Sequence, residues 1–336
     1  MNSFGRVFRV SLFGESRGEC VGAQVDGCPA GLRIRDGDFK EDMARRKAGA
    51  FGTTKRHEPD EPHISSGTFN GRTTGAPILI MIGNDDACAE GKAEKIARPG
   101  HADLAASKKF GGFNDTRGGG QFSGRLTAPL VAAGVVAKKV ASPVRIEAKL
   151  TDAGGRSDVR GAIEETVARG DTVGGTVECR VTGVPAGLGE PFFDSVESLL
   201  SHALFAIPGV KGMEFGKGFA CAGMRGSELN ALDTDALMKP TKFKRTRLDG
   251  SGGINGGLTN GNDIFFRVAI RPASTLSMPM NVVDLKSHRI VRTKFGGRHD
   301  TCFALRAPVI VEAAVALVLA DLMLIEHVRP RVAGGD

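Results

Sequence analysis

One long apolar segment, from Ala307 to Ile325, places the strongest constraint on how this chain of 336 residues can fold. The segment is long enough to cross a membrane, but Pro308, Glu312 and Asp321 interrupt it. Because charged residues are costly inside a bilayer, we expect no membrane span. The segment instead predicts a helix that is buried inside the protein or at a subunit interface.

Strand-like and helix-like segments are interspersed along the chain without a regular alternation. From apolar periodicity, strands are expected near residues 8–12, 77–82, 174–185 and 262–272, and helices near 128–141 and 195–207. Ser195 is a plausible N-cap for the second of these helices. No GxGxxG motif follows a strand into a helix, which argues against a doubly wound dinucleotide-binding fold. The pattern predicts an α+β fold.

Nothing resembling a linker divides the chain. Residues 1–336 are therefore expected to form a single large domain. The polar segment 150–175 is expected at the periphery, and residues 328–336 are expected to form a flexible tail.

Charge and cysteine usage narrow the class of protein. The net charge of +7 suits an anionic partner, but there is no run of five basic residues, so we expect no nucleic-acid binding. The six cysteines form no CxxC pair, which favours reduced thiols and no metal site. The N-terminus alternates like a strand and has no signal-peptide character. A cytoplasmic location is expected.

Glycine and arginine occur together in several loops. Examples are "ARRKAG" at 44–49, "RGGGQFSGR" at 117–125, "RPAST" at 271–275 and "GGRHD" at 296–300. Because arginine binds carboxylates and phosphates through a planar fork of donors, convergence of these loops would create a positively charged pocket. The chain has no Trp or Tyr, so a ligand ring could stack only on Phe or aliphatic side chains.

Candidate catalytic side chains lie in three glycine-flanked turns, the last of which overlaps the "GGRHD" loop. They are Ser16 and Arg17 in "FGESRGEC", His101 in "RPGHAD", and His299 with Asp300 in "GGRHDTC". Each turn alone would suit a solvated surface loop or a structural histidine. Together with the arginine loops they favour a functional site.

Ten motifs in this order resemble those of the chorismate synthase family. They are "FGESRG", "VDGCPAGL", "TTKRHEPDE", "SGTFNGRTTGAPI", "RPGHAD", "RGGGQFSGRLTAP", "GVPAGLGEP", "VKGMEFGKGF", "GGINGGLTNG" and "GGRHDTC". The resemblance runs from about Phe4 to His327. It implies a sheet-and-helix sandwich that assembles as a homotetramer.

The resemblance also implies a reaction. Chorismate synthases eliminate phosphate from 5-enolpyruvylshikimate 3-phosphate in an anti 1,4-elimination that needs reduced FMN without net redox change. The two carboxylates and the phosphate of this substrate would account for the arginine loops. A chain of this kind takes its reduced flavin from an external flavin reductase, with NADPH only as an indirect reductant.

Site residues follow from the resemblance motif by motif. His101 is similar to the family histidine beside the flavin, Asp300 to the acid near flavin N5, and Ser16 and Ser123 to the paired hydroxyls of the site. Matches to the flavin-binding stretches are Gln121, Phe122, Ser123, Pro208, Gly209, Gly256, Arg271, Pro272, Ala273, Ser274, Thr275 and Arg298. Arg46 and Arg125 match positions that bind anionic substrate or nicotinamide phosphate.

Two departures from the family pattern bear on catalysis. Arg17 stands where the family has a histidine that protonates the leaving phosphate, and arginine can neutralise charge there but cannot act as a general acid. The family's "GGGRSSARET" is "GGGQFSGRLT" here, which adds Phe122 and removes one arginine. The loop "RRKAG" replaces "RRRPG", and Phe110 stands where Tyr is common. An alternative hypothesis follows, namely a divergent paralogue that binds flavin or an anionic ligand with little synthase activity.

Overall fold

Two antiparallel sheets enclose a layer of helices in the computed structural model, which describes residues 2–54, 58–85, 96–237, 249–287, 289–295 and 299–328. In strand order, the first sheet contains β1 (Ser3–Phe4), β2 (Arg9–Gly14), β3 (Cys20–Asp26), β7 (Ile78–Gly83) and β4 (His63–Ser66). The second contains β11 (Val210–Phe215), β14 (Ile264–Ile270), β10 (Gly175–Thr182) and β9 (Arg145–Ala153). The predicted α+β sandwich is confirmed.

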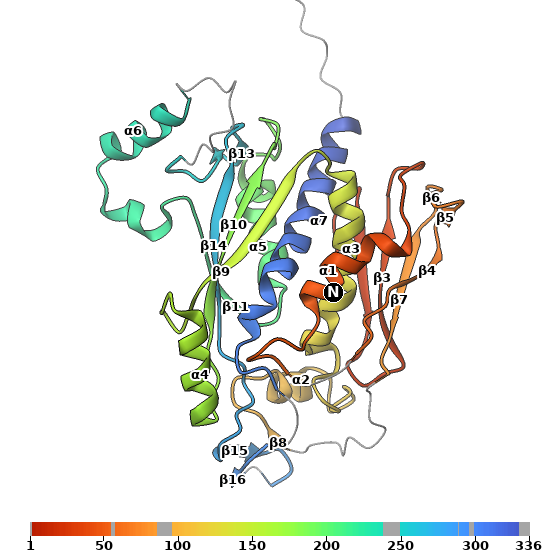
Figure 1. The fold of residues 1–336 in the computed structure, drawn as a ribbon, viewed down its shortest axis with the longest axis vertical. Helices are drawn as coiled ribbons and strands as arrows, with labels where there is room; N and C mark the ends of the chain where they lie inside the picture. Colours follow the sequence, from red (N-terminus) through yellow and green to blue (C-terminus); the bar gives the residue numbers. More distant parts are fainter. Residues whose placement is uncertain are drawn as a thin grey trace, which may run out of the picture.

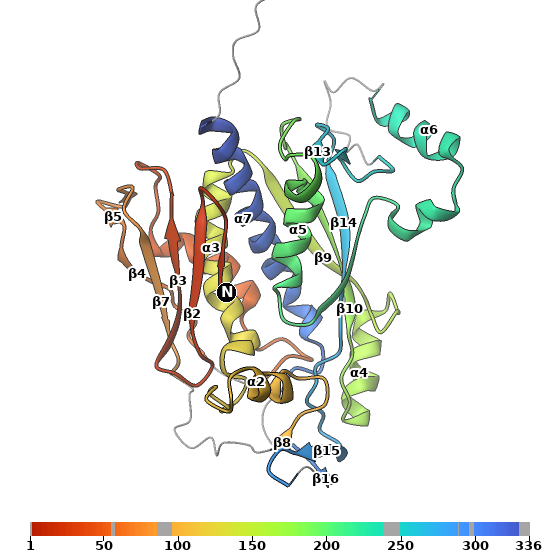
Figure 2. The same ribbon diagram turned by 180° about the vertical axis from the view of Figure 1, so that it is seen from behind.

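The helical layer is formed by α1 (Lys40–Arg46), α3 (Thr127–Val140), α5 (Val196–Phe205) and α7 (Ala307–Val328). Figures 1 and 2 show α3 and α7 side by side between the sheets. Helix α3 packs on β3 and β7, whereas α7 packs on β9 and β10. One apolar core therefore runs from sheet to sheet through the helices.

Strand periodicity explains how the second sheet covers α7. Along β14, Ile264, Phe266, Val268 and Ile270 are buried and the residues between them are more exposed. Opposite them, Val177 of β10 pairs with Val268 and Cys179 pairs with Phe266. Because alternate side chains point to the same face of a strand, this register places an apolar surface against the helix.

Helix α7 is the apolar segment that the sequence predicts to be buried. Among the described residues, Ala307–His327 is the helix long and apolar enough to cross a membrane, and 83% of its most apolar window is buried within the protein. Two of its three acids, Glu312 and Asp321, are buried and accept hydrogen bonds. Glu312 accepts hydrogen bonds from Arg45 and Lys138, and Asp321 accepts from the backbone N–H groups of residues 6–8. The prediction of a buried helix is confirmed.

A glycine allows α3 and α7 to approach closely. A Cβ at Gly134 of α3 would lie 2.4 Å from Cβ of Ala313 in α7. Such a distance is far inside van der Waals contact, so the helices can meet only where this side chain is absent.

The remaining elements lie around this sandwich. They are α2 (Asp103–Lys109), α4 (Val159–Arg169), α6 (Gly226–Leu237), β5 (Thr68–Phe69), β6 (Arg72–Thr73), β8 (Ile96–Ala97), β12 (Ile254–Asn255), β13 (Leu258–Thr259), β15 (Met280–Asp284) and β16 (Ile290–Thr293), with short 3-10 helices at Asp36–Phe39, Gly120–Phe122, Gly124–Leu126, Phe192–Asp194, Gly218–Gly223 and Phe303–Leu305. The polar segment 150–175 holds α4, most of whose side chains face solvent. Residues 329–336, the remainder of the predicted tail after Val328, lie outside the described residues.

The other element predictions hold to within a few residues. Ser195 does cap α5, because its Oγ accepts the backbone N–H of Ser198 at 3.1 Å. Helices α3 and α7 both begin at the end of the sandwich where α2, β8, β15 and β16 lie (Figure 1). This end carries the candidate site.

Candidate active site

A cavity of about 1580 Å³ opens where α3 and α7 begin. Its wall is assembled from residues within segments 2–4, 10–17, 46–54, 58–60, 98–102, 118–130, 202–211, 271–275, 295, 299–306 and 314–317. The first turn of each helix faces it, through Thr127 of α3 and through Arg306, which directly precedes α7. Because helix N-termini carry partial positive charge, the fold itself favours an anionic ligand here.

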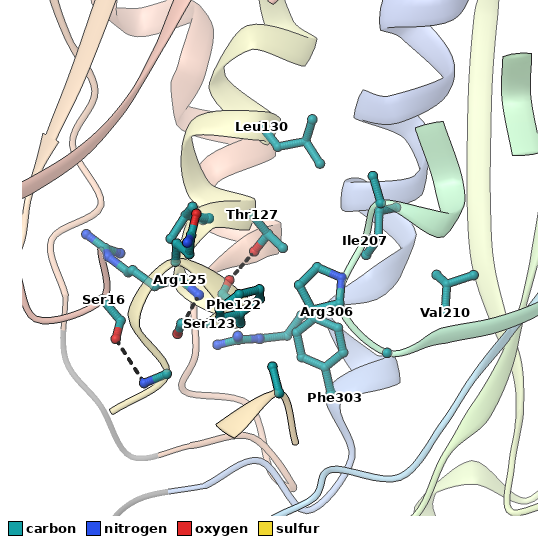
Figure 3. Close-up of a pocket in the computed structure, with 18 of the residues that line it drawn as sticks. Ser16, Phe122, Ser123, Arg125, Thr127, Leu130, Ile207, Val210, Phe303 and Arg306 are labelled. Atoms are coloured by element: carbon teal, nitrogen blue, oxygen red, sulfur yellow. Dashed lines mark hydrogen bonds between the residues drawn. The ribbon is translucent and has the colours of Figure 1, made fainter. Parts of the chain in front are cut away.

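The loop that follows β2 brings Ser16 and Arg17 to the cavity. Ser16 is 2% exposed, and its Oγ accepts the backbone N–H of Gly119 at 3.3 Å, as Figure 3 shows. Gly118 has a φ of +65°, and a Cβ there would lie 3.0 Å from Ser16 Oγ. Glycine at this position lets the loop containing residues 118–120 pack directly on the serine and Arg17.

The "RPGHAD" turn forms a compact ionic group on the cavity wall. Arg98 donates from Nε and Nη2 to the two oxygens of Asp103, each at 2.8 Å, and also to the carbonyl of Gly118. His101 Nδ1 lies 2.5 Å from Asp103 Oδ1. Burial disfavours the Asp103 carboxylate, but hydrogen bonds from Arg98 and His101 outweigh it and hold its pKa well below the usual range.

Arg46 and Arg125 lie on the wall, and both bind the buried carboxylate of Asp60. Arg46 also donates to Thr127 Oγ1 and to the carbonyl of Gly124. Burial, together with repulsion from nearby Arg306, lowers the pKa of Arg46 to about 10. Its guanidinium is thus part of a buried ionic cluster.

The guanidinium of Arg125 is also hydrogen-bonded to protein acceptors. Its Nε donates to Asn84 Oδ1 at 2.7 Å and its Nη2 to the carbonyl of Gly83 at 2.8 Å, in addition to the Asp60 contact. Every guanidinium nitrogen of both arginines therefore has a protein acceptor. Their predicted role as ligands of a substrate or nicotinamide phosphate stays a prediction.

Asp300 is held on the same wall by two neighbours. The backbone N–H of Thr54 donates to its Oδ1 at 2.8 Å, and Nη2 of Arg306 lies 3.5 Å from its Oδ2. Nearby, Ser123 caps the short helix Gly124–Leu126 by accepting the N–H of Arg125 at 3.1 Å. Asp300, from the loop before α7, and Ser123, from the loop before α3, thus line one cavity.

Most residues predicted for flavin binding also line the cavity. These are Gln121, Phe122, Ser123, Pro208, Gly209, Arg271, Pro272, Ala273, Ser274 and Thr275. Backbone pairing holds two of these segments together, since the N–H of Arg271 donates to the carbonyl of Gly209 at 2.8 Å. Gly256 lies instead in the β12–β13 hairpin and is not part of the cavity lining. Arg298 lies outside the described residues.

Three wall residues were not singled out from the sequence. Asp60 binds Arg46 and Arg125, Phe303 contributes a ring, and Arg306 points into the cavity beside that ring in Figure 3. A signal for Arg306 was present, because a charged residue stands immediately before the most apolar segment of the chain. Asp60 lies within "TTKRHEPDE", one of the ten motifs that resemble the family, but no role was assigned to it from the sequence.

Comparison with known proteins gives one consistent result. The family model described as chorismate synthase matches residues 8–324. The chain is 51% identical to a chorismate synthase of Chitinophaga pinensis, covering 99% of both chains, and 42% identical to one of Aeropyrum pernix, covering 100% of this chain and 99% of that one. A crystal structure of a chorismate synthase superposes with a TM-score of 0.72 at 24% identity, covering 96% of this chain and 93% of the other, and this supports the fold.

Proposed function

Because the chain belongs to the chorismate synthase family of lyases, we propose that its cavity converts 5-enolpyruvylshikimate 3-phosphate to chorismate and phosphate. One observation carries the assignment of the reaction to this cavity: Ser16, Arg17, His101, Ser123 and Asp300, which are far apart in the sequence, line it together. A substrate with two carboxylates and a phosphate also suits a wall rich in arginine.

The cavity suits reduced FMN together with the substrate. Single ligand pockets usually measure roughly 300–1,000 Å³, and this cavity exceeds that range. Phe122, Phe205 and Ile207 give it apolar surface suited to a flat ring system, beside the anion-attracting helix N-termini. The residues proposed to hold the flavin are Gln121, Phe122, Ser123, Pro208, Gly209 and Arg271–Thr275, and Gly256 and Arg298 are proposed on family resemblance alone. When bound, reduced flavin would supply electron density to the substrate ring.

His101 and Asp300 are proposed to handle protons next to the ligands. With Nδ1 directed to Asp103, the other ring nitrogen of His101, Nε2, is the one left to contact a ligand. The Thr54 N–H occupies Oδ1 of Asp300, and Oδ2, which lies 3.5 Å from Nη2 of Arg306, is the oxygen proposed to accept a proton and pass it to solvent. Ser16 and Ser123 are proposed to orient the substrate by hydrogen bonding.

Arg17 is proposed to stabilise the departing phosphate. A guanidinium can donate two parallel hydrogen bonds to phosphate oxygens and neutralise charge as it develops. The loss of general-acid assistance costs typically about 10² to 10⁴ in rate, and electrostatic stabilisation would offset part of it. The phosphate leaves already ionised, so elimination can proceed without a proton donor.

The competing function is a divergent paralogue that binds flavin or an anionic ligand without efficient elimination, and Arg17 together with Phe122 motivates it. An anaerobic assay with chemically reduced FMN separates the two. We expect the purified chain to form chorismate from the enolpyruvyl phosphate. Flavin binding without product would instead establish the paralogue, and turnover that appears only in Arg17→His would contradict the role of Arg17.

We further propose a homotetramer that works in the cytoplasm and receives reduced flavin from a separate reductase, with NADPH only as an indirect reductant. Phe192 and Phe193 are 87% and 92% exposed, which supports burial of this surface between subunits. The described cysteines are free thiols, which suits a reducing compartment. Sedimentation at the mass of four chains would support the assembly, and a monomer would contradict it.

A further inference from the structure

Arg306 occupies an unusual position on the cavity wall. It follows the short helix Phe303–Leu305 and directly precedes α7, and it is 7% exposed. Its guanidinium carbon lies 5.5 Å from the centroid of the Phe303 ring, and Figure 3 shows the side chain extending past that ring toward Ser123. The guanidinium therefore reaches the middle of the cavity while most of its surface is covered.

The hydrogen-bonding capacity of Arg306 is only partly used. Its Nε is buried and has no hydrogen-bond partner within the part of the chain that the structure describes. A buried donor without an acceptor destabilises a protein by more than a made hydrogen bond stabilises it, and a ligand that accepts from Nε would remove this cost. Arg46 and Arg125, by contrast, have protein acceptors at every guanidinium nitrogen.

The charge balance around Arg306 points to an anion. Its nearest carboxylate, Asp300, is 3.5 Å away and is also held by Thr54, while Arg306 itself repels the neighbouring Arg46. The partial positive charge of the α7 N-terminus adds to the excess of positive charge around Arg306. An incoming oxyanion would both accept the Nε–H and reduce the repulsion between the two guanidinium groups.

We propose that Arg306 is a substrate-binding residue whose Nε–H donates to a carboxylate oxygen of the substrate. This rests on the proposed function. If Asp300 contacts flavin N5, as the resemblance implies, the flavin phosphate at the far end of the ribityl chain would lie away from Arg306. The substrate phosphate is assigned to Arg17, so a carboxylate remains for Arg306.

Calorimetric titration of two variants tests the assignment. Arg306→Gln removes the charge, and Arg306→Lys keeps the charge beside Asp300 but lacks the Nε donor. The probes are 5-enolpyruvylshikimate 3-phosphate without flavin, chorismate, which keeps both carboxylates but has no phosphate, and oxidised FMN. Arg160→Gln, which removes a charge from the exposed surface of α4, is the matched control.

We expect both variants to bind substrate and chorismate about 10- to 100-fold more weakly, as for loss of a hydrogen bond to a charged group, with FMN affinity changed less than about threefold. If Arg306→Gln does not fold, as judged by circular dichroism, Arg306→Lys alone decides. Unchanged chorismate affinity, or a loss confined to FMN, overturns the assignment. If the wild type neither binds nor converts the substrate, the proposed function is overturned as well. If the wild type converts the substrate and the Arg306 variants bind it normally, only this inference is overturned.

Discussion

The Asp103 carboxylate lies 2.5 Å from Nδ1 of His101 and at the same time accepts two hydrogen bonds from the Arg98 side chain. One partly buried anion thus sets the orientation of an imidazole and a guanidinium that both face the cavity. With an ionised carboxylate as its partner, Nδ1 of His101 carries the proton, and Nε2 is the acceptor in the neutral ring.

Asp103→Asn should lower kcat at least about tenfold, because the amide does not select the Nδ1-protonated tautomer and holds Arg98 less strongly. Nitrogen NMR of the His101 ring in wild type should show a protonated Nδ1 in the neutral form and a mixture of tautomers in the variant. Asp36→Asn, outside the cavity lining, provides the control. An unchanged tautomer in Asp103→Asn would show that the carboxylate does not fix the ring.

Replacing Arg17 should change how the rate depends on pH. Arg17→Gln removes a donor to the leaving phosphate and should reduce kcat/KM by about 10² to 10³. Arg17→His should keep more activity at low pH and lose it above about pH 6.5, where an ordinary imidazole gives up its proton. Profiles of log kcat/KM against pH for the three proteins measure this difference. Parallel profiles for wild type and Arg17→His would exclude position 17 from phosphate departure.

Local patterns in the sequence predicted the main helices and strands of the core. They did not predict which strands pair with one another in the second sheet. The apolar segment Ala307–Ile325 predicted α7, and Ser195 predicted where α5 begins. Strand β9 was not predicted from the sequence, although Ile146, Ala148 and Leu150 alternate with charged residues along it and pack against the core. Its place beside β10 is set by long-range pairing, such as Ala148 opposite Cys179.

The motifs predicted which residues meet at the site but not how they are bound. Ser16, His101 and Asp300 line one cavity, as the order of motifs suggested. The sequence could not show that Asp60 would take up donors of both Arg46 and Arg125, since residues 46 and 125 lie in different segments. Which arginines keep donors for a ligand depends on such tertiary contacts.

Gly134→Ala should destabilise the protein by about 1–3 kcal/mol, although alanine favours helix formation. The new Cβ would overlap Ala313, whose Cβ would lie 2.4 Å away. Urea unfolding measures the loss, and adding Ala313→Gly should restore only part of it, because the Cα of residue 313 would still lie 2.7 Å from the new Cβ. Gly226→Ala is the control, because a Cβ at this glycine of α6 meets nothing within 4 Å. Equal stability of Gly134→Ala and wild type would contradict the close contact between α3 and α7.

Asp60→Asn should reduce stability at pH 7 by about 3–5 kcal/mol, because it leaves the buried guanidinium groups of Arg46 and Arg125 without their shared anion. Burial raises the pKa of Asp60, but the two arginines outweigh burial and hold it below its ordinary value. A carboxyl group whose pKa is lower in the folded state stabilises the protein fully above its unfolded-state pKa, about 3.9, and loses that contribution as the pH falls through the folded value.

The difference in unfolding free energy between wild type and Asp60→Asn, measured by urea unfolding, should therefore stay constant above about pH 5 and shrink below about pH 4. Asp194→Asn, which removes a partly exposed pair with Arg6, should cost less than about 1 kcal/mol across the same range. A deficit in Asp60→Asn no larger than that of Asp194→Asn would mean that Asp60 does not hold the two arginines in place.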